Sequence, residues 1–286
     1  MFVVAGVTGH VGSVVAKTLL EQKKPVRVIV RDAAKGNGWS QKGAEVAVGS
    51  LDDVRFLTQA LKGKGGFFAL LPPNYQAKDF IDAQYAAADA IAAAVKASGV
   101  PHVVLLSSIG ADLPAGTGPI KALHRLEEKL RASGAKMSAL RASYFQENAG
   151  SAVAPAKEAG IFPNFGNADY PFPMIATKDI GAAAVEALLH PPAKSEVIDV
   201  TGPAYSYRQV AEKLGNALGK TLRIVDIPPA QHVEALTKAG LSPSLAKEFA
   251  EMYAAFNAGK ATPKGDRAVQ GKTGLDETIR GLVGGA

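Results

Sequence analysis

The first half of the chain alternates short apolar runs with longer segments that have one apolar face. Runs rich in β-branched and aromatic residues predict strands at residues 2–7, 26–30, 45–48, 66–71, 103–107 and 137–140. Between them, apolar residues recur at helical spacings of three and four, as at Ile81, Tyr85, Ala88, Ile91 and Val95. Strands that alternate with helices build parallel sheets. The sequence therefore predicts an α/β fold with a doubly wound, Rossmann-type parallel sheet.

The pattern changes after residue 148. Prolines and aromatic residues predict a loop-rich segment at 149–175. A helix follows up to Leu189, with Thr177 or Asp179 as its N-cap, and then a strand at 196–200. Further helices are predicted at 207–218, 231–239 and 245–258, and the tail from Gly259 is polar and glycine-rich until Leu275. We expect a Rossmann domain at 1–148 and a smaller, mainly helical C-terminal lobe at 149–286, with 177–202 returning to pack on the sheet.

Composition and charge narrow the functional classes. The net charge is +6, which favours an anionic partner, but the basic residues are scattered among acids, so nucleic acid is disfavoured and an anionic cofactor is the simpler partner. The absence of cysteine excludes disulfides, thiolate metal sites and cysteine nucleophiles, and no metal site is expected. Residues 1–7 form a strand pattern rather than a signal peptide, and no apolar run could span a membrane, so we expect a cytoplasmic protein.

Three glycines separate the first predicted strand from the first helix. Gly6, Gly9 and Gly12 allow a sharp turn and bring backbone N–H groups close to a pyrophosphate at the positive end of the helix dipole. The alternative is a tight turn that binds no ligand. The flanking strand and helix favour a dinucleotide site, for which we predict contacts from Gly6, Thr8, Gly9, His10, Val11 and Gly12. The domain at 1–148 is then NAD(P)-binding and the lobe at 149–286 binds the substrate.

The end of the second strand bears on the choice of cofactor. Sites for NAD usually place an acid here to bind the ribose 2′-hydroxyl, whereas this chain has Arg31 at that position. A guanidinium can bind a 2′-phosphate through two hydrogen bonds, which favours NADPH over NADH. Asp32 is expected to pair with Arg31 or Lys35. The alternative is that Arg31 is a solvated residue at the end of a strand.

Several further blocks carry a family resemblance. They are Val28 to Asp32, Gly43 to Asp53, Leu70 to Pro73, Val104 to Ser108, Glu128 to Gly134, Leu140-Arg141, Tyr144 to Asn148 and Thr201 to Pro203. Together with the glycine loop, they resemble the NmrA-like branch of the atypical short-chain dehydrogenases over nearly the whole chain. That branch includes NADPH-dependent quinone, azo-dye and triphenylmethane-dye reductases, and also NADP-binding redox sensors.

The resemblance implies further cofactor contacts. Ser50 and Leu51 would lie beside the adenine, although the family usually has Asp where this chain has Ser50. Leu71, Pro72 and Pro73 would line the path to the nicotinamide ribose. Tyr144, Phe145 and Asn148 would border the nicotinamide and the substrate, and packing within the lobe is the alternative for the two aromatic residues.

The catalytic residues are not defined by the sequence. No Tyr-xxx-Lys pair of ordinary short-chain dehydrogenases follows Ser108, and the family's frequent lysine falls on Leu123. Lys121 is two positions away and would face differently on a helix. His124, Tyr144 and Tyr75 are the candidate proton donors, with water as the alternative. Ser107 or Ser108 offers a polar contact, but no nucleophile elbow supports hydrolysis.

Two functions fit these observations. The first is an oxidoreductase that transfers hydride from NADPH to a conjugated acceptor such as a quinone or an azo dye. Such acceptors are electrophilic, so positioning beside the nicotinamide can do most of the chemistry. The second is a non-catalytic NADP(H)-sensing regulator of the NmrA type, which explains the missing lysine directly. A small-molecule acceptor is the expected partner, with a homodimer or a regulatory protein as further options.

Overall fold

An eight-stranded sheet forms the centre of the computed structural model, which describes residues 1–284. Its strands are β1 (Phe2–Val4), β2 (Val26–Val30), β3 (Glu45–Val48), β4 (Gly66–Ala69), β5 (His102–Ser108), β6 (Lys136–Ala142), β10 (Glu196–Thr201) and β13 (Arg267–Gln270). They follow the order β3-β2-β1-β4-β5-β6-β10-β13, and every neighbouring pair is parallel. The predicted α/β fold with a doubly wound sheet is confirmed.

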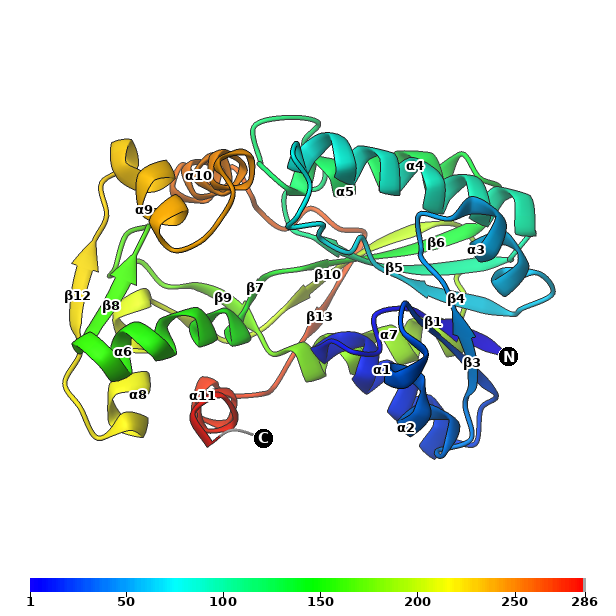
Figure 1. Ribbon diagram of the computed structural model, residues 1–286, viewed down its shortest axis with the longest axis horizontal. Helices are drawn as coiled ribbons and strands as arrows, with labels where there is room; N and C mark the ends of the chain where they lie inside the picture. The colour runs from blue at the N-terminus through cyan, green and yellow to red at the C-terminus, as the bar shows by residue number, and fades with distance from the viewer. Residues whose placement is uncertain (285–286) are drawn as a thin grey trace.

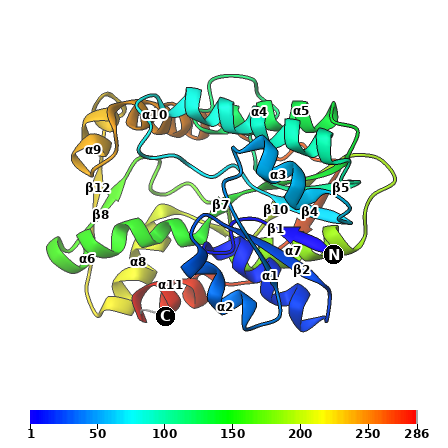
Figure 2. The ribbon, with the colours of Figure 1, turned by 45° about the vertical axis from the view of Figure 1, so that its right-hand side comes forward.

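Helices cover both faces of this sheet. Figures 1 and 2 show α1 (His10–Glu21), α2 (Asn37–Ser40) and α7 (Thr177–Leu189) on one face, and α3 (Val54–Leu61), α4 (Phe80–Ser98) and α5 (Ile120–Arg131) on the other. The short 3₁₀ helix η1 (Ala33–Gly36) links β2 to α2. The first half of the chain thus makes the three-layer arrangement that alternating strands and helices favour.

Burial on both faces explains the unbroken apolar runs of the strands. Successive strand residues point to opposite faces, so Val3 packs under α3 and α4 while Val4 packs under α1 and α7. Phe67 and Phe68 divide between the same two clusters, and both are fully buried. Central strands of a parallel sheet need apolar residues at every position for this reason.

The remaining elements form a lobe beyond β6 and β10. Its elements are β7 (Tyr144–Phe145), η2 (Gln146–Ala152), α6 (Val153–Ala159), β8 (Ile161–Asn164), β9 (Phe172–Ile175), β11 (Ala204–Tyr205), α8 (Tyr207–Leu218), β12 (Arg223–Asp226), η3 (Pro229–Gln231), α9 (His232–Lys238), α10 (Pro243–Asn257) and α11 (Leu275–Gly284). β11, β9 and β7 make one small sheet, and β12 and β8 make another. A third apolar cluster lies within the lobe, which occupies the left side of Figure 1.

The chain passes between sheet and lobe more than once. α7 packs on α1, β10 pairs with β6, and the polar tail supplies the edge strand β13, which the sequence did not predict. The expected caps of α7 are wrong, because Ala176 is its N-cap and the Glu147 carboxylate accepts a hydrogen bond from the Thr177 backbone N–H at 2.9 Å. Asp179 instead accepts hydrogen bonds from Thr273. The boundary at residue 148 stays a prediction.

Among residues 1–284, no helix is both long and apolar enough to cross a membrane.

Candidate functional site

The middle of the large sheet contains a point where the direction of winding reverses. The chain runs from β1 outward through β2 to β3, then returns to β4 on the other side of β1. Doubly wound sheets bind ligands in the crevice outside the carboxyl ends of strands at such a point. The glycine-rich loop follows β1, and residues 70–73 follow β4. A β-carbon on Gly6 would lie 2.1 Å from Leu70 Cδ2, so the two loops touch.

Two of the three glycines are required by the shape of the loop. Gly6 has φ +69°, a left-handed conformation that side chains disfavour. A β-carbon on Gly12 would lie 2.4 Å from the Gly6 carbonyl oxygen and 2.5 Å from that of Ala5. The Gly9 backbone N–H donates a hydrogen bond to Gly6 O at 2.9 Å, which closes the turn. These contacts press the start of α1 against the end of β1.

The first turn of α1 offers unpaired hydrogen-bond donors. Gly9 is the N-cap and has no side chain to cap the helix, and the first turn holds no acid. The first backbone bond of the helix is donated by the Ser13 N–H to Gly9 O. The N–H groups of His10, Val11 and Gly12 find no acceptor among residues 1–284. Free N–H groups at the positive end of a helix dipole make an anion site, which fits a pyrophosphate.

Arg31 lies at the end of β2 with its side chain exposed. Within residues 1–284, no carboxylate lies within 4 Å of it. The expected pairing of Asp32 with Arg31 or Lys35 is wrong. The Asp32 carboxylate instead accepts a hydrogen bond from the Ala34 N–H at 2.9 Å and caps η1. One oxygen of the Asp32 carboxylate is thus engaged within the chain, and the Arg31 guanidinium is available to an anion.

The next two loops lie along the same edge of the sheet. Ser50 follows β3 and is half-buried, and Leu51 is buried in the core under α3 and α4. After β4, Leu71 and Pro72 are half-buried, and Pro73 is exposed. The buried Gln84 amide donates a hydrogen bond to the Pro72 carbonyl at 3.0 Å, which fixes the start of this loop. The two loops follow β3 and β4, which are separated in the sheet by β2 and β1, and the predicted cofactor contacts at these loops stay predictions.

The residues predicted to donate a proton or to border the nicotinamide lie in different parts of the structure. Tyr75 lies in the loop after β4, with 57% of its surface exposed. Tyr144 and Phe145 form β7 and point to opposite sides, so Phe145 packs on the core that contains Val7 and Val11, and Tyr144 packs on the lobe. Asn148 is exposed in η2. Of these residues, Phe145 is the one that packs against the cluster containing Val7 and Val11 of the glycine-rich loop.

Helix α5 carries the position where a lysine was expected. At about 100° per residue, Lys121 points about 160° away from Leu123 around the helix axis. The Lys121 ammonium is held by α10, at 2.9 Å from a Glu248 carboxylate oxygen. Burial disfavours its charge, but hydrogen bonding and the charge of Glu248 outweigh this effect, and the pKa of Lys121 is raised. Lys121 is thus a tether to the lobe on the face opposite Leu123.

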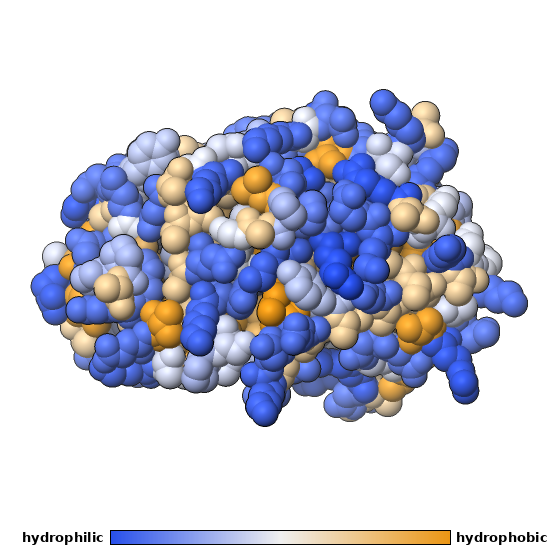
Figure 3. Space-filling view, turned by 90° about the horizontal axis from the view of Figure 1, so that it is seen from above, coloured by the Kyte–Doolittle hydropathy of each residue, from blue (hydrophilic) through white to orange (hydrophobic). Residues whose placement is uncertain are grey.

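His124 lies on the same outer side of α5. Its Nδ1 is 2.9 Å from the Ala111 carbonyl oxygen, so Nδ1 carries the proton and donates it. A hollow of about 280 Å³ between α4 and α5 is lined by Tyr85, Pro114, Lys121, His124, Arg125, Glu128 and Lys129. Figure 3 views the molecule from the side of α4, α5 and α10, where hydrophilic residues cover most of the face. No residue of the glycine-rich loop lines this hollow.

The model of the NmrA-like family matches residues 1–279. The chain belongs to the NmrA-like family. The resemblance inferred from the separate sequence blocks is thereby confirmed.

One curated relative of this chain is the NAD(P)H azoreductase of Xenophilus azovorans. It is 33% identical over 258 residues, which cover 89% of this chain and 86% of the azoreductase. Quinone oxidoreductase 2 of Escherichia coli is 26% identical over 262 residues, with 88% and 86% covered. Among solved structures, the triphenylmethane reductase of Citrobacter complexed with NADP(H) has a TM-score of 0.81 at 19% identity, covering 99% of this chain and 100% of the other. The last comparison shows the shared fold.

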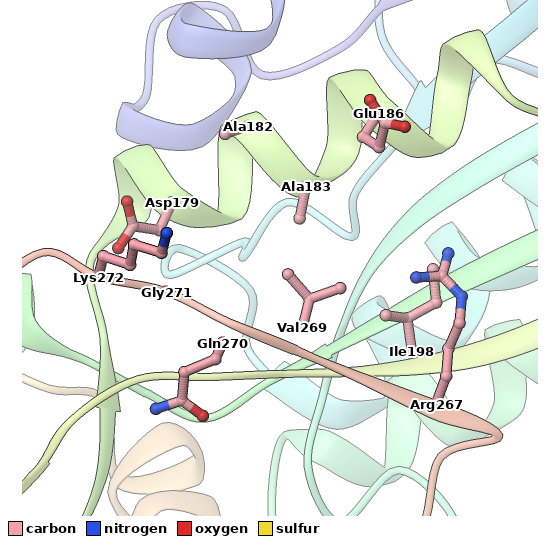
Figure 4. Close-up of a pocket in the computed structure, with 10 residues that line it drawn as sticks. All are labelled: Asp179, Ala182, Ala183, Glu186, Ile198, Arg267, Val269, Gln270, Gly271 and Lys272. Atoms are coloured by element: carbon pink, nitrogen blue, oxygen red, sulfur yellow. The ribbon is translucent and has the colours of Figure 1, made fainter.

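Further hollows and buried charges lie outside the loop region of this NmrA-like fold. A hollow of about 330 Å³ is lined by residues of α7, β10, β13 and the segment after it (Figure 4). In Figure 4, Ala183 of α7 and Val269 of β13 face one another across this space. It contains no residue of the glycine-rich loop and no predicted site residue. This hollow is a feature of the sheet edge.

Sequence reasoning missed a buried ion pair below the carboxyl end of β5. Arg141 of β6 donates hydrogen bonds to both carboxylate oxygens of Glu127 on α5, at 3.0 and 2.7 Å. Ser107 donates to the same carboxylate at 2.6 Å, so its hydroxyl is used in the structure. Burial disfavours the charge of Arg141, but Glu127, Asp112 and Asp199 outweigh this and raise its pKa. A lone arginine within the apolar strand pattern was the sequence signal for this pair.

Proposed function

We propose that this NmrA-like chain is an NADPH-dependent reductase that transfers hydride to a conjugated acceptor such as a quinone or an azo dye. One observation carries the proposal: unpaired N–H groups of α1 lie at the switch point of the sheet, and the unpaired Arg31 follows β2, the strand beside β1. The azoreductase relative supports the class of reaction. These donors fit the pyrophosphate and the 2′-phosphate of NADPH, as the glycines allow close approach of the backbone.

Bound NADPH supplies the hydride, and the protein's part is to bind and orient. The glycine-rich loop would hold the pyrophosphate, Arg31 the 2′-phosphate, and residues 71–73 the side of the nicotinamide ribose. Quinones and azo compounds accept hydride readily, so a reductase for them can work by positioning and by excluding water. An apolar Leu123 is compatible with this chemistry. Tyr144 is our proposed source of the proton, because it is the candidate donor that packs beside β9 and the lobe.

A second function is favoured by one observation. Leu123 is apolar and Lys121 is tethered to Glu248, so α5 presents no ammonium in the direction where the family's lysine is expected. A chain that binds NADP(H) without turnover and signals this binding to a partner would not need a lysine at this position. A homodimer or a regulatory protein partner belongs to this second proposal.

The test mixes the protein with NADPH and a panel of quinones and azo dyes, and follows the absorbance of the reduced nicotinamide. We expect protein-dependent, saturable oxidation with at least one acceptor. NADPH binding is measured separately through the fluorescence of Trp39, the single tryptophan. Tight binding without turnover across the panel would support the sensor, and a chain that binds no NADPH would overturn both functions.

Replacing Arg31 with alanine tests the choice of cofactor. A bidentate, charge-assisted contact with a phosphate contributes roughly 1.5–3 kcal/mol, so the variant should bind NADPH about 10- to 100-fold more weakly. NADH lacks the 2′-phosphate, and its affinity should change little. Lys17→Ala on the exposed side of α1 is the matched control, since it removes a cation elsewhere. Equal losses for the two cofactors in a binding titration would contradict the assignment.

A further inference from the structure

The amino ends of the parallel strands form one edge of the large sheet, which we call the amino edge. Every β-α-β crossover returns the chain to this edge before the next strand begins. Lysines lie shortly before, or at, the first residue of most of these strands, and we call them the lysine row. In the order of the strands from β3 to β10, they are Lys42, Lys23 and Lys24, Lys62 and Lys64, Lys96, Lys136 and Lys194.

The amino edge lies away from both the lobe and the predicted cofactor site. In Figure 1 the N-terminus, where β1 begins, is on the right, and the lobe is on the left. The glycine-rich loop follows the carboxyl end of β1, which is the opposite edge of the sheet. A partner bound at the amino edge would therefore leave the cofactor loop free.

The lysine row is exposed and its charges are not neutralised. Its members are exposed to solvent except for Lys64, which is half-buried. Within residues 1–284, no carboxylate lies within 4 Å of any of these ammonium groups. Acids at the same edge are paired with other cations: Glu21 with Lys17, Glu45 with Arg27, and Glu196 with Arg267. The amino edge thus keeps an excess of positive charge.

Compensation of helix dipoles does not account for this row. Cations are favourable near the C-terminus of a helix, but the effect is confined to the last turn. The last turns of α1, α3 and α7 contain no basic residue, whereas that of α4 contains Lys96. Most of the row lies instead in the connections between helix and strand. These lysines are therefore available to an external anion.

The sheet gives the row a regular spacing. Neighbouring strands are about 4.8 Å apart, so the strands from β3 to β10 carry the row over roughly 29 Å. Each strand of a DNA duplex carries one phosphate charge for every 3.4 Å or so of the helix axis. A row of this length faces about eight such phosphates. A linear array of cations fits a linear polyanion.

The lack of apolar groups at the amino edge distinguishes between polyanionic partners. The exposed large apolar side chains of residues 1–284 are Met1, Val48, Val54, Tyr75 and Tyr170, and of these Met1 alone lies at this edge. Peripheral membrane binding uses a set of apolar side chains for insertion, and proteins that bind single strands stack the bases on aromatic rings. A duplex stacks its bases internally and presents its phosphates, so it needs neither.

We propose that the lysine row binds the phosphate backbone of double-stranded nucleic acid without regard to base sequence. The ammonium groups replace counter-ions that are condensed on the phosphates, and the release of these ions drives binding. The sequence disfavoured nucleic acid because its basic residues are scattered along the chain. The parallel topology brings these lysines, which lie between residues 23 and 194, to one edge.

The test measures the fluorescence anisotropy of a fluorescein-labelled DNA duplex of about 20 base pairs as the full chain is added. We expect a Kd of roughly 1–100 μM near 0.15 M salt, unchanged for a duplex of different sequence. The logarithm of the association constant should fall with that of the salt concentration, with a slope between about −4 and −7. No binding to the duplex at about 50 mM salt, or binding to vesicles of phosphatidylcholine and phosphatidylserine in its place, would overturn the proposal.

A charge-matched pair of variants locates the binding surface. The triple variant Lys24→Gln, Lys62→Gln, Lys194→Gln removes three exposed members of the row. It should bind the duplex at least about tenfold more weakly at about 50 mM salt, with a slope shallower by about 2–3.

The control removes three exposed lysines of the lobe region, Lys157→Gln, Lys247→Gln and Lys260→Gln. Both variants lower the net charge by three, from +6 to +3. The control should bind within about threefold of the parent chain, because phosphate contacts act at short range in salt. Both variants should keep the parent's denaturant midpoint, as surface substitutions usually do. Equal losses of duplex affinity in the two variants would show that net charge, rather than the lysine row, binds the duplex.

Discussion

Replacing Glu127 with alanine is expected to lower the free energy of unfolding by about 3–5 kcal/mol. The Glu127 residue is 1% exposed and Arg141 is 7% exposed, and the guanidinium bonds both carboxylate oxygens. The variant leaves a buried guanidinium without its main partner, and it also leaves the Ser107 hydroxyl without its acceptor. Of the other acids near Arg141, Asp112 and Asp199, Asp112 is 4.0 Å away and already pairs with Lys264. Denaturant unfolding at neutral pH measures the loss.

Glu128→Ala is the matched control for this prediction. Glu128 is the next residue on α5, its side chain is 63% exposed, and its ion pair with Arg131 spans 3.7 Å. Surface pairs of this kind contribute about 0–1 kcal/mol, so the control should unfold nearly as the parent chain does. A similar small effect for both variants would show that Arg141 finds other compensation inside the fold.

Lowering the pH from neutral to about 4 is expected to cost this fold about 3 kcal/mol through His102 alone. Burial lowers the pKa of His102 from 6.5 to about 4; Glu196 opposes this shift and Lys136 adds to it. The folded chain therefore keeps the imidazole neutral where the unfolded chain binds a proton. The stability is complete above about pH 6.5 and is lost as the pH falls from there toward the folded pKa.

His102→Gln isolates this contribution. The variant cannot take up the proton, and its amide can still pair with the Ser138 hydroxyl, which lies 3.1 Å from His102 Nε2. Between neutral pH and pH 4, the unfolding free energy of the parent should therefore fall by about 3 kcal/mol more than that of the variant. His190→Gln serves as the control, because the His190 side chain is 69% exposed. A difference that stays constant with pH would show that His102 is protonated in the folded chain.

The strands and helices of the first half were predictable because their signals are local. The residues that define β2 and β3 match their predicted bounds. Other strands are shorter than predicted. β1 and β4 end at Val4 and Ala69, whereas the predicted strands continued to residues 7 and 71. Central strands are apolar on both faces and their helices have one apolar face, so the pattern specifies the element before any long-range contact forms.

The elements of the second half were harder to predict because their partners are distant. β13 is a four-residue edge strand with mostly exposed side chains, so it carries no apolar run. It is placed by pairing with β10, and the Asp266 carboxylate accepts a hydrogen bond from the Val197 N–H. β8 and β12 likewise pair with each other across the lobe, 62 residues apart (Ile161 to Arg223). Such strands depend on tertiary pairing rather than on periodicity.

The features of the candidate site also fall into two groups, those predicted from the sequence and those set by tertiary contacts. The sequence by itself determined the glycine-rich loop and the position of Arg31, because both depend on spacing within one β-α-β unit, and the family resemblance placed Leu123 where a lysine is frequent. Only the tertiary structure decided that α10 tethers Lys121 and that Glu127 neutralises Arg141. The spacing of residues close in the chain predicts a turn. The pairing of charged side chains depends instead on which distant elements the fold brings together.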